Sequence, residues 1–164
     1  RVSGKSYEEL LREIIWQPLQ MNNSRIALAG GDSTRFAIGH GPNGQAVHSW
    51  EFQSLAGCGA IRSCINDMLL YAKAQGSKDG SALSKAIQLT HETNFEYGQH
   101  KLGLGWHIFT QNGTRYIAHD GQTGGYCSSI IVNPASGNAV VILTNASVQP
   151  FNIAIALTQS LDKK

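Results

Sequence analysis

The residues with the clearest chemical potential are His119 and the glycine-rich bend that follows it. They belong to the stretch Ile117-Ala-His119-Asp120-Gly121-Gln122-Thr123-Gly124-Gly125-Tyr126, which lies between two β-like runs, 114–118 and 127–132. A strand that leads into such a bend presents backbone N–H groups where side chains do not crowd a ligand. An imidazole at its entrance can exchange a proton near neutral pH. Taken alone, the pattern also suits a plain hairpin whose histidine merely ends a strand.

Composition restricts the function classes. The 164 residues fit a single domain, and 41% hydrophobic with 15% charged residues is typical of a globular protein. The net charge is only +2, and no cluster of Lys and Arg exceeds a local pair, so a nucleic-acid partner is not expected. No apolar run reaches membrane-spanning length, and no signal peptide is recognisable.

Cysteine and histidine spacing gives no support for a metal or another cofactor. Cys58, Cys64 and Cys127 allow at most one disulfide, and they form no C-x-x-C pair. The six histidines are scattered, without the H-x-x-x-H spacing that places two ligands on one helix face. We therefore expect no cofactor.

Several elements must position the glycine-rich bend. Ser6 and Glu9 form a capping box, which predicts a helix that ends near Trp16, before Pro18. Residues 22–55 contain turn clusters, among them Gly30–Ser33, between short β-like pieces, and this predicts a loop and hairpin excursion.

Two further helices are expected in the middle of the chain. Ser63 is the predicted N-cap of a helix that runs to about Gln75, and a second helix spans about 83–90. Asp67 is tempting as a catalytic carboxylate, but its place in the first turn favours a helix-capping role.

The remainder of the chain predicts an antiparallel meander over 103–145 and a closing helix over 150–162. Asn112-Gly113 is a strong tight-turn signal between two of the strands, and Pro150 suits a helix start. Helices followed by a run of strands indicate an α+β fold, with flanking helices packed on an antiparallel sheet of three or four strands.

Several stretches together resemble the penicillin-recognising serine hydrolases, which include class C β-lactamases, DD-peptidases and related esterases. Residues 3–9 and 16–21 are similar to the family's S-G-K-(S/P)-Y-E-E and P-L-G-M segments, with Gln20 in place of Gly. Residues 56–68 are similar to its A-G-G…S-T-x-x-D-M segment, with Cys64 in place of Thr. His119-Asp120-Gly121 matches the third catalytic motif, which is K-T-G or H-x-G. These matches occur in the family's order along nearly the whole chain.

The resemblance implies roles for the bend. His119 would replace the lysine of K-T-G in the proton network, and the backbone N–H of Gln122 would supply half of an oxyanion hole. The substrate-binding wall would consist of Asp120, Gly121, Thr123, Gly124 and Gly125. A carboxylate at position 120 would repel an anionic β-lactam and so favours ester or peptide substrates.

The family's nucleophile is absent from this sequence. Its S-x-x-K and Y-x-N motifs precede the first helix of this chain, and the look-alikes here are Ser160–Lys163 and Ser136–Asn138. We therefore expect 1–164 to be the carboxy-terminal portion of one β-lactamase-like domain. The expected partner of that domain is a small-molecule or peptide acyl substrate, and we expect this portion to be inactive alone. Family habit would place it in the periplasm or outside the cell.

Two alternatives remain. The chain could be a non-catalytic module that binds a peptide or a cell-wall ligand, or a structural module whose bend has no ligand. An S-x-x-K followed by Y-x-N in the parent reading frame would select the enzyme. If the missing half normally covers this sheet, the isolated chain should expose apolar faces and self-associate.

Overall fold

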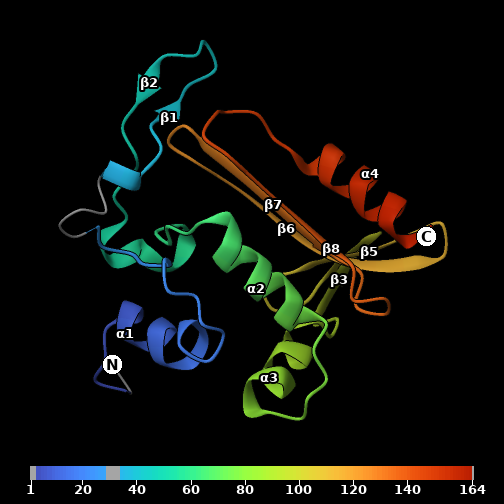
Figure 1. Cartoon of the computed structure of the whole chain (residues 1–164). Coiled ribbons are helices and arrows are strands. Elements are labelled where there is room, and N and C mark those ends of the chain that lie inside the picture. The colour runs from blue at the N-terminus through green and yellow to red at the C-terminus, as the bar shows by residue number, and fades with distance from the viewer. Residues whose placement is uncertain (1–2, 29–33, 164) are drawn as a thin grey trace.

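The computed structural model describes residues 3–28 and 34–163, and it confirms the α+β class expected from the sequence (Figure 1). One long antiparallel sheet is flanked by helices on both faces. The predicted turn cluster Gly30–Ser33 lies outside the described residues. None of the described helices is both long enough and apolar enough to cross a membrane.

The first helix forms as its capping box predicts. Helix α1 (Tyr7–Leu11) begins after Ser6, whose hydroxyl accepts from the Glu9 N–H while the Glu9 carboxylate accepts from the Ser6 N–H. It continues directly into a π-helical turn, η1 (Arg12–Trp16). Gln20 then adopts φ 60°, a left-handed conformation in which glycine is less strained than any other residue.

The excursion contains a small hairpin of strands β1 (Gly39–His40) and β2 (Ala46–Val47). It returns through a short 3₁₀ segment, η3 (Gln53–Cys58). The hairpin is tied to the main sheet, because the His40 N–H donates to the backbone oxygens of Gly125 and Asn145. This attachment brings the excursion against the end of the long central strands (Figure 1).

The two middle helices are α2 (Ile65–Gln75) and α3 (Ala82–Thr90). The expected N-cap at Ser63 is wrong: the N-cap position of α2 is Cys64, and it makes no side-chain capping bond. Ser63 instead shares a hydrogen bond of 2.8 Å with the hydroxyl of Ser24. Helix α3 does have a capping serine, Ser81, which accepts from the N–H of Ser84.

The main sheet is a meander of six strands in sequence order, larger than the three or four strands expected. The strands are β3 (Phe95–Tyr97), β4 (His100–Leu102), β5 (His107–Gln111), β6 (Thr114–Thr123), β7 (Tyr126–Val132) and β8 (Ala139–Thr144). The sequence pattern missed β3 and β4 because they are short and largely exposed, and so carry no alternation of apolar and polar residues. The tight turn at Asn112-Gly113 is confirmed, with φ 52° and 76°.

Each face of the sheet has its own core. On the α2 side the fully buried Ile117 packs with Ile108 and Val132 in one cluster that also holds Ala72 of α2. On the other side Ala118 and Ile131 pack against Ala154 of the closing helix, α4 (Phe151–Asp162). Successive residues of β6 therefore point alternately toward α2 and toward α4, and this alternation sets the direction of the side chains in the bend that follows.

Candidate active site

The His119 stretch occupies a free edge at the end of β6. Strand β5 covers β6 only as far as Ala118, which pairs with His107. Strand β7 follows β6 to its last residue, Thr123, which pairs with Tyr126. Residues 119–123 thus have a strand on one side only, and their other side is open to a ligand.

Antiparallel geometry directs the Gln122 N–H to this free edge. Thr123 and Tyr126 flank a two-residue bend, and in such a hairpin the flanking residues form a hydrogen-bonded pair. The next pair, Gln122 and Cys127, is then a non-hydrogen-bonded pair, and the same holds for Asp120 and Ser129. The N–H and C=O groups of Gln122 and Asp120 therefore point away from β7, toward the free edge.

The predicted site residues share this edge but divide between the two faces of the sheet. His119 is exposed and faces the α2 side, because its cross-strand neighbour Ile130 belongs to the α2 core. Gly121 and Thr123 lie on the same face. Asp120 faces the α4 side, together with the side chain of Gln122. The structure thus separates the Asp120 carboxylate from the imidazole of His119.

Gly124 and Gly125 lie against the excursion, and Gly124 is half-buried whereas Gly125 is buried. A β-carbon on Gly124 would lie 2.6 Å from the His48 carbonyl oxygen and 2.7 Å from Cδ1 of Trp50. One on Gly125 would lie 2.4 Å from a methyl of Val47, and Gly125 is buried with φ 78°. These two glycines let the excursion approach the bend closely.

The excursion brings aromatic residues to the site that the sequence pattern did not assign to it. The indole of Trp50 is 56% exposed and lies against Gly124. Its ring centroid is 6.2 Å from that of Phe52, in an edge-on arrangement. Phe52 in turn fills the space above Gly59, beside the methyl of Thr123. The only sequence signal was a set of aromatic residues in a loop, without any indication of where the loop folds.

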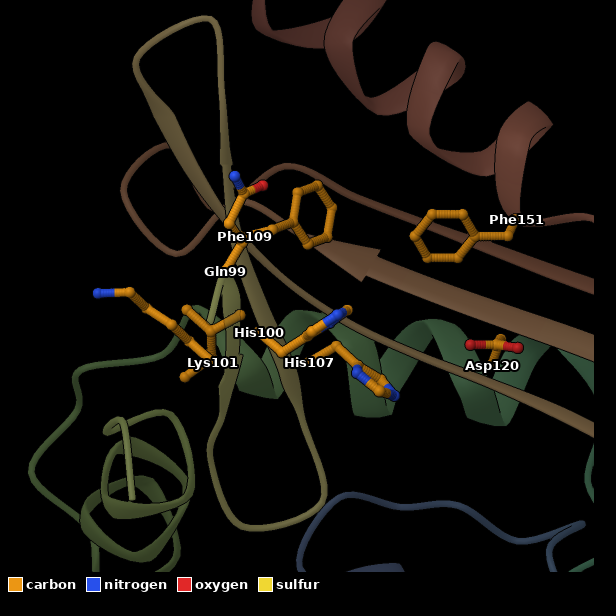
Figure 2. Close-up of a pocket in the computed structure, with 8 residues that line it drawn as sticks. Gln99, His100, Lys101, His107, Phe109, Asp120 and Phe151 are labelled. Carbon is orange, nitrogen blue, oxygen red and sulfur yellow. The ribbon is translucent and has the colours of Figure 1, made fainter. Parts of the chain in front are cut away.

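A hollow of about 280 Å³ opens on the α4 side of the β6 edge (Figure 2). Figure 2 shows Asp120 and Phe151 toward one end of the hollow and Lys101 toward the other, with the imidazoles of His100 and His107 between them. The full lining is Gln99, His100, Lys101, His107, Ile108, Phe109, Asp120 and Phe151. The ring of His107 is also 6.0 Å from that of His119, so the hollow begins next to the candidate catalytic imidazole.

Asp67 lies in the first turn of α2, as expected, but its carboxylate does not bond to the N–H groups of that turn. It is 2% exposed, and its carboxylate accepts from the Asn23 N–H at 2.8 Å and from the Ser24 hydroxyl at 2.8 Å. The capping interpretation is therefore wrong, because the carboxylate fixes the turn at 22–24 against α2. The partners are more than forty residues away in the chain, which no local pattern could reveal.

The two nucleophile look-alikes are placed away from the edge. Ser136 lies in the turn between β7 and β8, where its hydroxyl donates to the Asp162 carboxylate at 2.9 Å. Ser160 lies in the last turn of α4. Among the described residues, no group of three or more His, Cys, Asp or Glu side chains is arranged to hold a metal ion.

Comparisons with known proteins agree with this architecture. The family model described as beta-lactamase matches residues 1–162. The chain is 25% identical to an unguisins hydrolase of Aspergillus campestris over 99% of its length, and 24% identical to penicillin-binding protein 4 of Amycolatopsis lactamdurans over 90%. A solved class C beta-lactamase superposes with a TM-score of 0.87 at 21% identity, over 97% of this chain.

The chain is shorter than each of these proteins. It spans 34% of the unguisins hydrolase and 43% of the penicillin-binding protein. It covers 52% of the class C beta-lactamase structure. The fold described above thus corresponds to about half of the larger fold.

Proposed function

Because the chain belongs to the beta-lactamase family, we propose that its β6 edge is one wall of an active site for acyl transfer. The observation that carries the proposal is the free edge itself. It presents the His119 side chain on one face and, in the direction of the edge, the N–H of Gln122. The family acts on small-molecule acyl compounds, and esters or peptides are the substrates we propose here.

In the proposed reaction, a serine hydroxyl from the complementary half of the fold attacks the substrate carbonyl carbon. The carbonyl oxygen becomes an oxyanion, which the Gln122 N–H and a second backbone N–H would stabilise. His119 would hold and return the proton that passes from the hydroxyl to the leaving group. Water would then hydrolyse the acyl-enzyme and release the acid. We propose a periplasmic or extracellular location on family habit.

The substrate would lie along the edge as an added strand. The unpaired N–H and C=O groups of Asp120 and Gln122 can bond to its backbone, while Gly121 and Thr123 line the face that His119 shares. The roles of Gly124 and Gly125 would be to hold Trp50 and the excursion at the end of this track. Asp120 would contribute its backbone to the track and its side chain to the α4 side.

The test compares the 164-residue chain alone with the chain co-expressed with its complementary amino-terminal half. A nitrophenyl ester and a chromogenic cephalosporin serve as substrates. We expect no turnover above background by the chain alone, since covalent catalysis needs an activated nucleophile that it lacks. The assembled protein should hydrolyse the ester. Tight binding of a peptide without turnover would favour the non-catalytic binding module instead.

Two substitutions at one position test the oxyanion role. Gln122→Pro removes the N–H from an edge position where proline is tolerated, whereas Gln122→Ala keeps the N–H. In the assembled protein we expect Gln122→Pro to lower kcat by about 10²–10³-fold, the usual effect of losing one oxyanion donor. Gln122→Ala should stay within a few-fold of the parent. Equal losses in both variants would overturn the assignment of the backbone N–H.

A further inference from the structure

The hollow on the α4 side of the β6 edge has an unusual charge distribution. Lys101 carries its main positive charge, but the Lys101 ammonium lies 3.1 Å from the Glu96 carboxylate and is thereby neutralised. Asp120 is half-buried, and no hydrogen bond or ion pair reaches its carboxylate from the part of the chain that the structure describes. Asp120 is therefore the lining charge without a counter-charge.

A second polar group beside Asp120 also has no partner. Ser129 is directly across from Asp120 on β7, so both side chains stand on the same face of the sheet. Ser129 is 2% exposed, and its hydroxyl oxygen has no hydrogen-bond partner among the described residues. Ser129 is not among the residues that line the hollow, so the Asp120 carboxylate is the anionic group that a ligand there would meet.

Two phenyl rings also line the hollow. The ring centroids of Phe109 and Phe151 lie 6.2 Å apart, and both rings line the hollow (Figure 2). Faces of aromatic rings attract cations, and their area favours an apolar body. A carboxylate without a counter-charge and two phenyl rings together favour an ammonium group over an anion.

We propose that this hollow is a subsite for a primary ammonium group attached to an apolar body. The acyl substrate is then an amine-bearing compound, such as an aminoacyl ester or a peptide with a free amino end. This statement about the substrate rests on the proposed acyl-transfer function. The binding of the ammonium group does not, because every lining residue lies within this chain.

The test is a binding titration of the 164-residue chain, in which NMR chemical shifts report the binding. The probes are phenylalanine amide, its N-acetyl derivative, in which the charge is removed, and 3-phenylpropionate, in which the charge is reversed. We expect phenylalanine amide to shift signals of Asp120, Phe151 and His107, with the acetylated probe binding at least about tenfold more weakly. 3-Phenylpropionate should bind weakest of the three.

Variants identify the group responsible. Asp120→Asn keeps the shape of the side chain and should abolish the preference for the charged amine over the acetylated probe. Glu51→Gln removes one negative charge from the exposed excursion and should leave the preference unchanged. The ligand comparison on the parent chain stands even if Asp120→Asn fails to fold.

Three outcomes would overturn the proposal: equal affinity for the free and acetylated amines, tighter binding of 3-phenylpropionate, or an unchanged preference in Asp120→Asn. Failure of the proposed function looks different, because it appears as an assembled protein that does not hydrolyse esters. Amine binding with no hydrolysis would retain this subsite and remove only its role in an acyl substrate.

Discussion

The ring centroids of His107 and His119 lie 6.0 Å apart, at the point where the pairing of β5 with β6 ends and the free edge of β6 begins. The two rings have different surroundings. His119 stands on the exposed α2 side beside the edge, while His107 lines the hollow on the α4 side. In the proposed reaction, His119 would act on a carbonyl bound at the edge, and His107 would contact the remainder of the substrate.

This arrangement predicts unequal effects of removing the two rings. In the protein assembled with its complementary half, His119→Ala should lower kcat for a nitrophenyl ester by about 10²–10⁴-fold, as expected for a lost general acid–base group. His107→Ala should act mainly on KM and lower kcat less than tenfold. Steady-state kinetics of the two variants check this. A loss of kcat in His107→Ala as large as that in His119→Ala would contradict the assignment.

The buried His91 predicts how stability depends on pH. It is 4% exposed, and its Nε2 lies 3.0 Å from Oε1 of Gln75. Burial, and secondarily the nearby charge of Arg115, lowers the pKa of His91 from 6.5 to about 4. Between these values the unfolded chain binds a proton that the folded chain does not, so the free energy of unfolding falls as the pH falls from 6.5 to 4.

The size of this effect is roughly 2–3 kcal/mol across the window. Urea denaturation at several pH values measures it. The His91→Gln variant should be less stable than the parent chain at neutral pH. Because its side chain cannot be protonated, its free energy of unfolding should fall less steeply in acid. Identical slopes in the variant and the parent chain would show that other groups govern the acid sensitivity.

The left-handed conformation of Gln20 predicts a stabilising substitution. Gln20→Gly should raise the free energy of unfolding by about 1 kcal/mol, because glycine adopts φ 60° without the clash of a β-carbon. Gln17→Gly is the matched control, since Gln17 has φ −65° and a right-handed conformation. The control should be destabilised by about 0.5–1 kcal/mol. Thermal unfolding of both variants measures the two effects, and a loss of stability in Gln20→Gly would refute the strain.

The exposed apolar faces predict self-association of the isolated chain. On α4, Ile153, Leu157 and Leu161 recur at every fourth residue and are 61%, 49% and 41% exposed. Such a stripe is typical of a contact surface. We expect concentration-dependent sedimentation and binding of a hydrophobic dye. The double variant Ile153→Lys with Leu157→Lys should reduce both signals.

A matched pair of charges serves as the control for that experiment. Asn152 and Ser160 are exposed polar residues of the same helix, so Asn152→Lys with Ser160→Lys adds the same charge without removing apolar surface. The control should associate like the parent chain. A monomeric parent that binds no dye at high concentration would count against the exposed-face prediction.

Local patterns in the sequence determined much of this fold. The Ser6–Glu9 capping box, the Asn112-Gly113 turn and the closing helix all depend on residues within a few positions of one another, and each formed as predicted. The ordered motifs also identified the family, and they singled out residues 117–126 as the candidate site. These features could be predicted because the interactions that stabilise them are local in the chain.

The tertiary structure alone decided how the site is arranged. The sequence could not show that the pairing of β5 with β6 stops at Ala118, and this leaves the backbone of Gln122 free on that side. It could not place Asp120 and His119 on opposite faces, since that depends on which helix covers which side of the sheet. Nor could it find the partners of Asp67 or bring Trp50 to Gly124. Each of these contacts joins residues far apart in the chain, and such contacts are set by the packing of whole elements.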